Sequence, residues 1–191
     1  LYYDEDLILD ARLNILDPYV DKFIICEALF SHSGRKKELN FDINKFPKFK
    51  DKIIYIVQET EPKNIIYKDS SKKIEDPKDW RANAVKRIAH QRNKLLDEVN
   101  TLADEDDYIL YSDNDEIPNL EKFDLKATKK KFVIFDQQIF YYKLNLSLPN
   151  LNWFGSKACK IKYLKSVDFL RNIKNREYSN FRIDTLFSDN K

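Results

Sequence analysis

The sequence has little glycine: Gly34 and Gly155 are the only two among its 191 residues. Phosphate-binding loops of the GxxxxGKS/T or GxGxxG kind place at least two glycines within a few residues of each other. That spacing is absent, so both kinds of loop are excluded. A nucleotide bound by this chain must be held by side chains and a metal ion instead.

Cysteine and long apolar runs are also scarce. The two cysteines, Cys26 and Cys159, are too few for a disulfide framework, which weakly favours a reducing compartment. Cys26 ends the apolar run 23–26 and is expected to be a buried, small hydrophobic residue. No apolar stretch approaches the roughly 18–20 residues that cross a bilayer, and no signal peptide is visible. We therefore expect no membrane span in this chain.

A strong excess of one charge is missing as well: 34 basic and 32 acidic residues leave a formal net charge of +2. Nucleic-acid-binding proteins usually carry a clear basic excess, so we expect no nucleic-acid partner. The lysine run 129–131 is expected to be a solvated turn. The abundance of lysine, isoleucine and asparagine is typical of AT-rich genomes. We expect a microbial or viral cytoplasmic protein, or a Golgi lumenal one if the source is eukaryotic.

What the chain does contain is a series of strand and helix patterns in an alternating order. In the second expected helix, Ala84, Ile88, Leu95 and Val99 lie on or near one face. The order predicts an α/β fold with a mostly parallel sheet and helices on its faces. The expected elements are a strand ending at 1–3, a helix 7–16, strands 20–28 and 53–57, an irregular segment 58–80, a helix 83–99, strands 108–111, 132–140 and 160–164, and a helical turn 167–173.

An acidic cluster follows the expected strand 108–111, in the segment Ser112-Asp113-Asn114-Asp115-Glu116-Ile117-Pro118. Ligands of such sheets bind at the carboxyl ends of the strands. On an extended chain Asp113 and Asp115 point the same way, and two like charges at one buried place need a cation or protons to offset them. Their hard oxygen ligands suit Mg²⁺ or Mn²⁺. An acidic surface turn or a helix start is the equally open alternative, whereas an EF-hand loop fits badly because its sixth position would be Pro118.

Polar residues also follow or flank the other expected strands. Tyr3-Asp4-Glu5 ends the first strand, Glu27 ends the second, and Gln91-Arg92-Asn93 lies in the helix before the acidic strand. Each has an ordinary interpretation: a helix cap, a solvated glutamate and a polar helix face. Together they place polar groups where a nucleotide diphosphate would lie.

The order of these features resembles the GT-A glycosyltransferases, whose first strand ends in a Y-N-E-like motif and a later strand in D-x-D. More narrowly, the chain resembles glycosyltransferase family 17, the family of β-1,4-mannosyl-glycoprotein β-1,4-N-acetylglucosaminyltransferase. The family patterns are V-D-x-F-V-x-x-E, Q-R-N and S-D-x-D-E-I-P, and the resemblance covers about residues 1–155. The matching stretches are 6–14, 20–27, 34–37, 91–93 and 112–118.

The resemblance implies a role for each matching position. Asp115 would bind the metal, and Asp113 would contact the metal or the nucleotide ribose. Glu27 would lie near the nucleoside. Arg92 and Lys37 would contact the donor phosphates, because their charge complements them. The further donor-binding positions are Glu5, Asn93 and Glu116, and the sugar-site positions, which resemble a W-x-G stretch, are Trp153 and Gly155. For Trp153, packing in the core is an equally open interpretation.

The resemblance also implies one glycosyltransferase domain spanning residues 1–191, with a GT-A-type fold in which a Rossmann-like, mostly parallel sheet is flanked by helices. Family members continue into a G-W-H-F-S-like segment and a later His-containing stretch. Neither appears before Lys191, and the first strand is short. The domain is therefore expected to be truncated at both ends.

The implied activity is an inverting, metal-dependent transfer of a sugar, such as N-acetylglucosamine, from a UDP-linked donor to a glycan acceptor, with Mn²⁺ or Mg²⁺ as cofactor. An inverting transfer needs a carboxylate that takes the proton of the acceptor hydroxyl. Asp136 and Asp184 follow the acidic cluster, but no motif assigns the base. Two other functions stay open: a sugar-nucleotide pyrophosphorylase-like nucleotidyltransferase, and a non-catalytic sugar- or metal-binding module.

Overall fold

The structure, a computed structural model, describes residues 1–175, so Asp184 lies outside the described part. The chain divides into two compact units, Leu1–Ala103 and Asp104–Lys191. Each unit has its own strands, helices and buried residues. The expectation that they form one domain stays a prediction.

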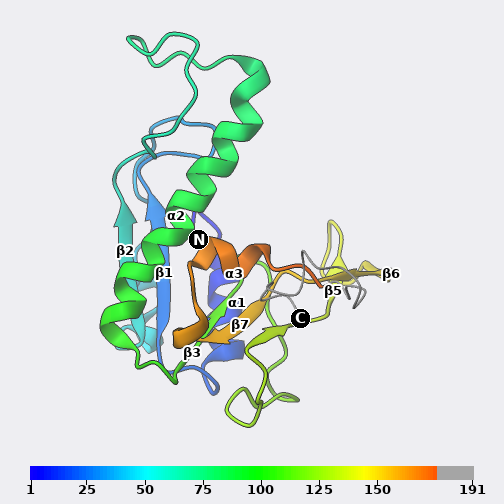
Figure 1. The fold of residues 1–191 in the computed structure, drawn as a ribbon. Helices are drawn as coiled ribbons and strands as arrows, with labels where there is room; N and C mark the ends of the chain where they lie inside the picture. The colour runs from blue at the N-terminus through cyan, green and yellow to red at the C-terminus, as the bar shows by residue number, and fades with distance from the viewer. Residues whose placement is uncertain (176–191) are drawn as a thin grey trace, which may run out of the picture. The chain divides into compact units, whose positions relative to one another are not determined.

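The first unit is built on two parallel strands with helices beside them (Figure 1). β1 (Phe23–Ala28) pairs with β2 (Ile53–Gln58), from Phe23 opposite Ile53 to Ala28 opposite Gln58. Both strands are rich in β-branched isoleucine, which suits a pleated surface. α1 (Asp6–Leu16) precedes β1, and α2 (Trp80–Leu102) follows β2 and packs against both strands. The connections contain the 3₁₀ turns η1 (Ile43–Lys45), η2 (Pro47–Phe49) and η3 (Pro77–Asp79).

The start of the chain lies beside β1 without forming a regular strand. The amide of Tyr2 donates to the carbonyl oxygen of Cys26 at 3.0 Å. Residues 1–3 therefore bond to β1 at Tyr2 but do not form the expected strand. Cys26 itself is fully buried, as predicted, and burial raises the pKa of its thiol to about 11.

α2 buries the expected face only in its second half, where Leu95 and Val99 are buried as predicted. Its buried residues repeat every four positions, which is one row along the surface of a helix. Ala84 and Ile88 of the expected face are only partly buried. Polar side chains occupy the row where it is most deeply buried because each finds hydrogen-bonding partners there, as described below. The buried residues of α2 are Asn83, Arg87, Gln91, Leu95 and Val99.

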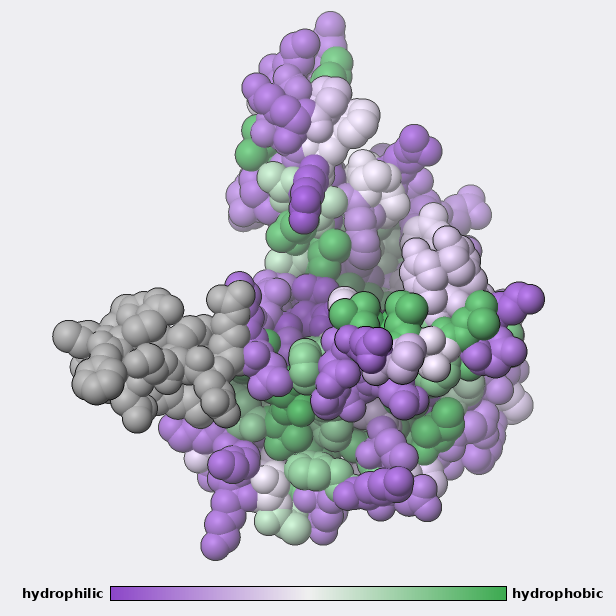
Figure 2. All heavy atoms as spheres, turned by 90° about the vertical axis from the view of Figure 1, so that its right-hand side faces the viewer, coloured by the Kyte–Doolittle hydropathy of each residue, from purple (hydrophilic) through white to green (hydrophobic). Residues whose placement is uncertain are grey.

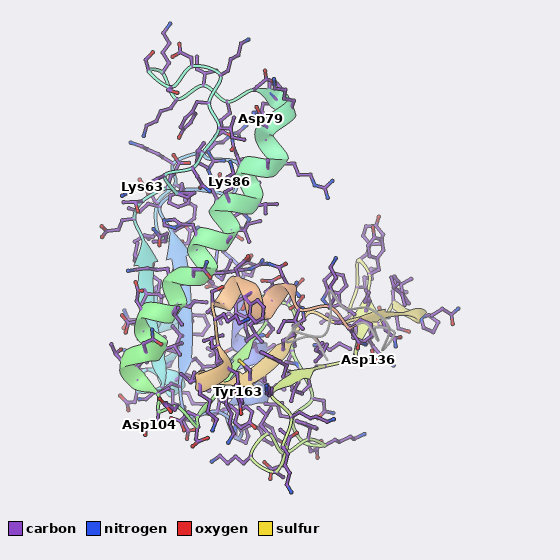
Figure 3. The ribbon with its side chains drawn as sticks, viewed as in Figure 1. Lys63, Asp79, Lys86, Asp104, Asp136 and Tyr163 are labelled. Carbon is purple, nitrogen blue, oxygen red and sulfur yellow. The ribbon has the colours of Figure 1, made fainter. Side chains whose placement is uncertain are left out.

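The segment between β2 and α2 is irregular, as predicted, but α2 anchors it. In Figure 3, Asp79 and Asp104 mark the two ends of α2, Lys86 lies on the helix and Lys63 lies in the irregular segment. The ammonium group of Lys86 donates to the carbonyl oxygen of Asn64 at 2.7 Å. Such contacts give a long loop fixed points along the helix.

The second unit has two antiparallel sheets. β7 (Lys157–Lys160) is the central strand of the first sheet, and its Ala158 lies opposite both Leu110 of β3 (Tyr108–Tyr111) and Val133 of β4 (Phe132–Ile134). Ala158 and Cys159 are fully buried, as a central strand requires. The second sheet is the hairpin of β5 (Gln137–Phe140) and β6 (Ser147–Trp153). η4 (Ile161–Tyr163) and α3 (Val167–Asn172) follow β7.

The hairpin exposes several apolar side chains. Tyr142 is 90% exposed and Leu144 is 80% exposed. On the face shown in Figure 2, hydrophobic residues lie among hydrophilic ones. Scattered exposed apolar residues of this kind are common on protein surfaces.

The mixed α/β class is confirmed, whereas a single mostly parallel sheet is not seen in the described residues. β1 and β2 are parallel, but β3, which carries the acidic cluster, pairs in antiparallel fashion with β7. The GT-A-type sheet therefore stays a prediction. The expected strand 132–140 is interrupted after Ile134, where the amide of Phe135 donates to Ser156. The expected strand 160–164 was wrong, because the strand is Lys157–Lys160, whose short Lys-Ala-Cys-Lys sequence has no apolar run to mark it.

Candidate functional site

The predicted site residues divide between the two units, and each unit gathers some of them. Glu27 and Lys37 meet in the first unit, and Asp113, Glu116, Trp153 and Gly155 meet in the second. The others lie on more exposed parts of their own units. Glu5 and Asn93 are exposed, Arg92 is partly buried, and Asp115 is exposed.

Glu27, at the end of β1, is a fully buried carboxylate with four hydrogen bonds. Oε1 accepts from the ammonium group of Lys37 and from the amide of Asn40 at 2.8 Å. Oε2 accepts from the amide of Phe41 at 3.1 Å and from the hydroxyl of Tyr55 at 2.9 Å. A buried charge is tolerated when it is paired and fully hydrogen-bonded in this way. Glu27 therefore holds residues 37–41 against the ends of β1 and β2.

Aromatic rings complete this arrangement in the first unit. Phe41 stacks on Tyr55 with ring centroids 4.6 Å apart, and the edge of Tyr2 meets Phe41 at 5.5 Å. Burial and the hydrogen bond to Glu27 raise the pKa of Tyr55 above its ordinary value. Its hydroxyl thus stays protonated and donates to the carboxylate. The Lys37–Phe41 loop is ordered by its ion pair with Glu27, by two backbone hydrogen bonds to the same carboxylate and by this aromatic stack.

The predicted site residues that follow the first expected strand and those of the Q-R-N motif belong to the first unit, where Glu5 and Gln91 bond to the backbone. Oε2 of Glu5 accepts the amides of Tyr3 at 3.0 Å and Asp4 at 3.2 Å, which caps the start of the chain before α1. Gln91 of the Q-R-N motif is buried and donates to the carbonyl oxygen of Cys26 at 3.0 Å. Gln91 therefore ties α2 to β1, while Arg92 and Asn93 lie on the less buried side of the helix.

Sequence reasoning missed Arg87, which is almost completely buried in α2. Its Nε donates to Glu61 at 2.6 Å, and its Nη2 forms an ion pair with Glu75. Asn83, one turn earlier, donates to Glu75 and to the carbonyl oxygen of Ile66, both at 2.8 Å. These two polar residues hold the irregular segment 58–80 against the helix. The only sign of this buried polar face in the sequence was the spacing of Asn83, Arg87 and Gln91, which are four residues apart.

The acidic cluster of the second unit forms a turn instead of an extended segment. The amide of Glu116 donates to the carbonyl oxygen of Asp113 at 3.1 Å. The expected reason for pairing Asp113 with Asp115 was therefore wrong, since residues two apart in a turn do not share a direction. The side chains that converge are Asp113 and Glu116, and Asp115 points to the exposed surface.

Glu116 is the centre of this turn and is nearly buried, with 7% of its side chain exposed. Its Oε2 accepts the amide of Asp113 at 2.9 Å, and its Oε1 accepts the indole Nε1 of Trp153 at 2.5 Å. A β-carbon at Gly155 would collide with the Glu116 carboxylate and with Nε1 of Trp153. Glycine is therefore required for this close approach. The W-x-G stretch thus packs directly on the acidic turn.

Arg171, another residue that the sequence reasoning missed, joins these groups. Its Nη2 lies 2.8 Å from both Asp113 Oδ2 and Glu116 Oε1, and its Nη1 donates to the carbonyl oxygen of Gly155 at 2.8 Å. Its guanidinium carbon lies 5.9 Å from the ring centroid of Trp153, within the range of a cation–π contact. No motif marked Arg171, because its partners are 16 to 58 residues away in the sequence.

The turn offers a divalent cation two carboxylates, Asp113 and Asp115. The described residues contain no group of three or more histidine, cysteine, aspartate or glutamate side chains arranged to hold a metal. Asp115 is exposed and takes no hydrogen bond or ion pair from any described residue, and 31% of the Asp113 side chain is exposed. Mg²⁺ is usually bound through one or two carboxylates plus substrate phosphates, so these oxygens suit it. The metal site stays a prediction.

The candidate bases remain unassigned. Asp136, labelled in Figure 3 between β4 and β5, is exposed and accepts Nδ2 of Asn152 at 2.8 Å. That bond lies within the hairpin region and involves none of the turn residues. No motif favours Asp136, and its surroundings in the structure do not favour it either.

None of the described helices is both long enough and apolar enough to cross a bilayer. Comparison with known families finds that the pattern of glycosyltransferase family 17 matches residues 1–168. No protein of curated function and no solved structure matches the chain. The match covers the whole first unit and most of the second, and it includes every predicted donor, metal and sugar residue, but it ends before Arg171 and before Asp184.

Proposed function

Because this chain belongs to glycosyltransferase family 17, a family of transferases that move a sugar from a donor to an acceptor, we propose that it is an inverting enzyme that uses a UDP-linked donor and a divalent metal. The acceptor under this proposal is a glycan, and the transferred sugar is N-acetylglucosamine. Mn²⁺ or Mg²⁺ is the proposed cofactor. The proposed location is the cytoplasm of a microbial cell or a virus-infected cell, or the Golgi lumen in a eukaryote.

One observation carries this proposal: the turn after β3 presents Asp115 to solvent while its other carboxylates are tied down. Glu116 is held by the Asp113 amide and by Trp153, and Asp113 is held by Tyr111 and Arg171. The turn is therefore rigid and still has one unpaired carboxylate among the described residues. A rigid acidic turn with an available oxygen ligand is what a metal-bound diphosphate needs.

Within the proposal, Asp115 binds the metal and Asp113 contacts the metal or the ribose. A divalent ion bound there supplies positive charge that stabilises the departing nucleotide diphosphate. Trp153 offers its ring to the sugar, and Gly155 leaves the space that the ring and Glu116 need. The base that takes the acceptor proton is not assigned.

In the first unit, the proposal gives Lys37, Arg92, Glu5 and Asn93 to the donor and places Glu27 near the nucleoside. The Glu27 carboxylate already accepts four hydrogen bonds, so its part is to order the Lys37–Phe41 loop. The two cysteines of the chain are free and buried, which agrees with a reducing compartment.

Isothermal titration of UDP with Mn²⁺ and with EDTA tests the proposal. We expect binding that requires Mn²⁺ and that falls at least about tenfold in Asp115→Ala, because a single lost charged ligand changes the free energy by more than about 1.4 kcal/mol. Asp51→Ala, which makes the same chemical change at an exposed aspartate outside the matching stretches, is the control and should bind as the wild type does. A screen of UDP-, GDP- and CMP-sugars for donor hydrolysis then identifies the donor.

Other outcomes would overturn the proposal in recognisable ways. Tighter binding of a nucleoside triphosphate than of UDP favours a sugar-nucleotide pyrophosphorylase-like activity. Binding of no nucleotide at all favours a non-catalytic sugar- or metal-binding module. Equal UDP binding with Mn²⁺ and with EDTA shows that nucleotide binding does not need the metal, which contradicts the metal-dependent part of the proposal.

A further inference from the structure

The backbone of Arg171 is fixed by the packing of α3. The hydroxyl of Ser166 accepts the amide of Phe169 at 3.0 Å and caps the helix, and Val167 and Leu170 are fully buried. The ammonium group of Lys157, on the buried strand β7, donates to the carbonyl oxygen of Arg171. The side chain of Arg171 therefore starts from a well-defined place in the second unit.

The guanidinium group connects segments that are far apart in sequence. It bonds the turn after β3 through Asp113 and Glu116, and it bonds the link between β6 and β7 through Gly155. Only 14% of the Arg171 side chain is exposed. A planar group with five N–H donors makes such a set of bonds in one orientation, which the ammonium group of a lysine does not.

Arg171 also fixes the direction of Asp113. The Asp113 carboxylate accepts from Tyr111 on Oδ1 at 2.9 Å and from Arg171 on Oδ2 at 2.8 Å. With both oxygens engaged, the side chain cannot rotate without breaking a bond. Without Arg171, Asp113 and Glu116 would be two like charges at one poorly solvated place, which is costly.

The side chains of this group carry both signs of charge. Asp113, Asp115 and Glu116 are three carboxylates, and Arg171 offsets one of them. Arg171 therefore reduces the repulsion between the carboxylates of the turn.

We propose that Arg171 is a positioning residue of the donor site, which holds Asp113, Glu116 and Trp153 in the arrangement that the metal-bound nucleotide requires. This inference rests on the proposed function and adds a residue that lies beyond the family match. Arg171 acts through the acidic turn and the tryptophan, and no direct contact with the donor is assigned to it.

UDP titration of Arg171→Met and Arg171→Lys tests the inference. We expect Arg171→Met to weaken Mn²⁺-dependent UDP binding about tenfold or more, because two charge-assisted hydrogen bonds to the turn are lost. Arg171→Lys keeps the charge without the planar geometry and should lie between wild type and Arg171→Met. Arg81→Met makes the same change at an exposed arginine of α2 and should bind as the wild type does.

A second readout needs neither nucleotide nor activity. Trp80→Phe leaves Trp153 as the only tryptophan of the chain. In that background, Arg171→Met should change the emission of Trp153 in the free protein, because the cation near its ring and one of the partners of Glu116 are removed. Circular dichroism of each variant shows that it is folded, and if Arg171→Met does not fold, Arg171→Lys carries both measurements.

The outcomes separate the two proposals. If wild type binds UDP with Mn²⁺ and the folded Arg171 variants bind equally well, the positioning role is wrong and the proposed function stands. Unchanged Trp153 emission in a folded variant also contradicts the positioning role. If wild type shows no Mn²⁺-dependent UDP binding, the proposed function fails, and the positioning role fails with it.

Discussion

Two arginines, one in each unit, bind two carboxylates each, but the two arginine side chains differ in their exposure to solvent. In the first unit, 1% of the Arg87 side chain is exposed, and its partners Glu61 and Glu75 are 25% and 12% exposed. In the second unit, 14% of the Arg171 side chain is exposed, and its partner Asp113 is 31% exposed. The carboxylate partners are similarly exposed in the two clusters, since Glu116, the other partner of Arg171, is 7% exposed. We call the first cluster closed because its arginine is almost completely buried, and the second open because it adjoins the exposed Asp115. A closed cluster contributes to folding alone, and an open one is accessible to a ligand.

Each cluster also uses one of the two glycines. Gly34 has a φ of +82°, and a β-carbon there would lie 2.5 Å from Nη2 of Arg87. Gly155 leaves room for Glu116 and Trp153 and gives its carbonyl oxygen to Arg171. In a chain with so little glycine, both residues stand where a side chain would collide with a charged cluster.

Removing Arg87 should have the largest effect on folding. Arg87→Met leaves Glu61 and Glu75 without their cation, and breaking a buried ion pair by removing one partner costs about 3–5 kcal/mol. Urea unfolding measures this cost, with Arg81→Met as the exposed control. A loss below about 1 kcal/mol would remove the distinction between a closed and an open cluster.

The two glycines give the next largest effects and sharpen the same comparison. Gly34→Ala forces a side chain into a left-handed backbone and against Arg87, so we expect a loss of about 1–3 kcal/mol. Gly155→Ala should displace Trp153 from Glu116. We expect it to reduce the free energy of Mn²⁺-dependent UDP binding by more than it reduces the free energy of unfolding. Urea unfolding and UDP titration of both variants check this. The comparison is wrong if Gly34→Ala weakens UDP binding more than Gly155→Ala does.

The smallest expected effect is at an ion cluster on the surface of the second unit. Hydrogen bonds from Lys162 and Lys160 hold the pKa of Asp106 down at about 2, below its ordinary value of 3.8. Since the pKa is lower in the folded state, the stabilisation is present above pH 3.8 and is lost as the pH falls through about 2. Asp106→Asn should therefore lower the melting temperature slightly at pH 7 and not at all near pH 2. Melting curves across this range measure it, and a difference that grows toward low pH would contradict it.

Several features of the molecule follow from local sequence. The helices at 6–16 and 80–102 and the strands at 23–28, 53–58 and 108–111 lie where the apolar patterns predicted them, because periodic burial is visible in the residues themselves. The burial of Cys26 followed from the apolar run around it. The family, too, was evident from S-D-x-D-E-I-P and Q-R-N, and the match over 1–168 confirms it.

The partners of the charged residues could not be predicted in this way. Strand β7 contains two lysines in four residues and becomes recognisable only when β3 and β4 pair with it. The closing of the acidic segment into a turn depends on Glu116 bonding the Asp113 amide, and Trp153 and Arg171 stabilise that bond from 37 and 55 residues away. Local sequence patterns carry no information about contacts between residues that are so far apart in the chain.

The sequence alone thus determined the helices and strands between residues 6 and 111, the family, and the position of the acidic cluster after a strand, because each depends on a pattern of neighbouring residues. Only the tertiary structure decided that Asp113 and Glu116 share one arginine while Asp115 faces solvent, and that Glu27 is saturated by four donors. The physical reason is that the free energy of a charged side chain depends on the groups around it, and folding brings those groups together from distant parts of the chain.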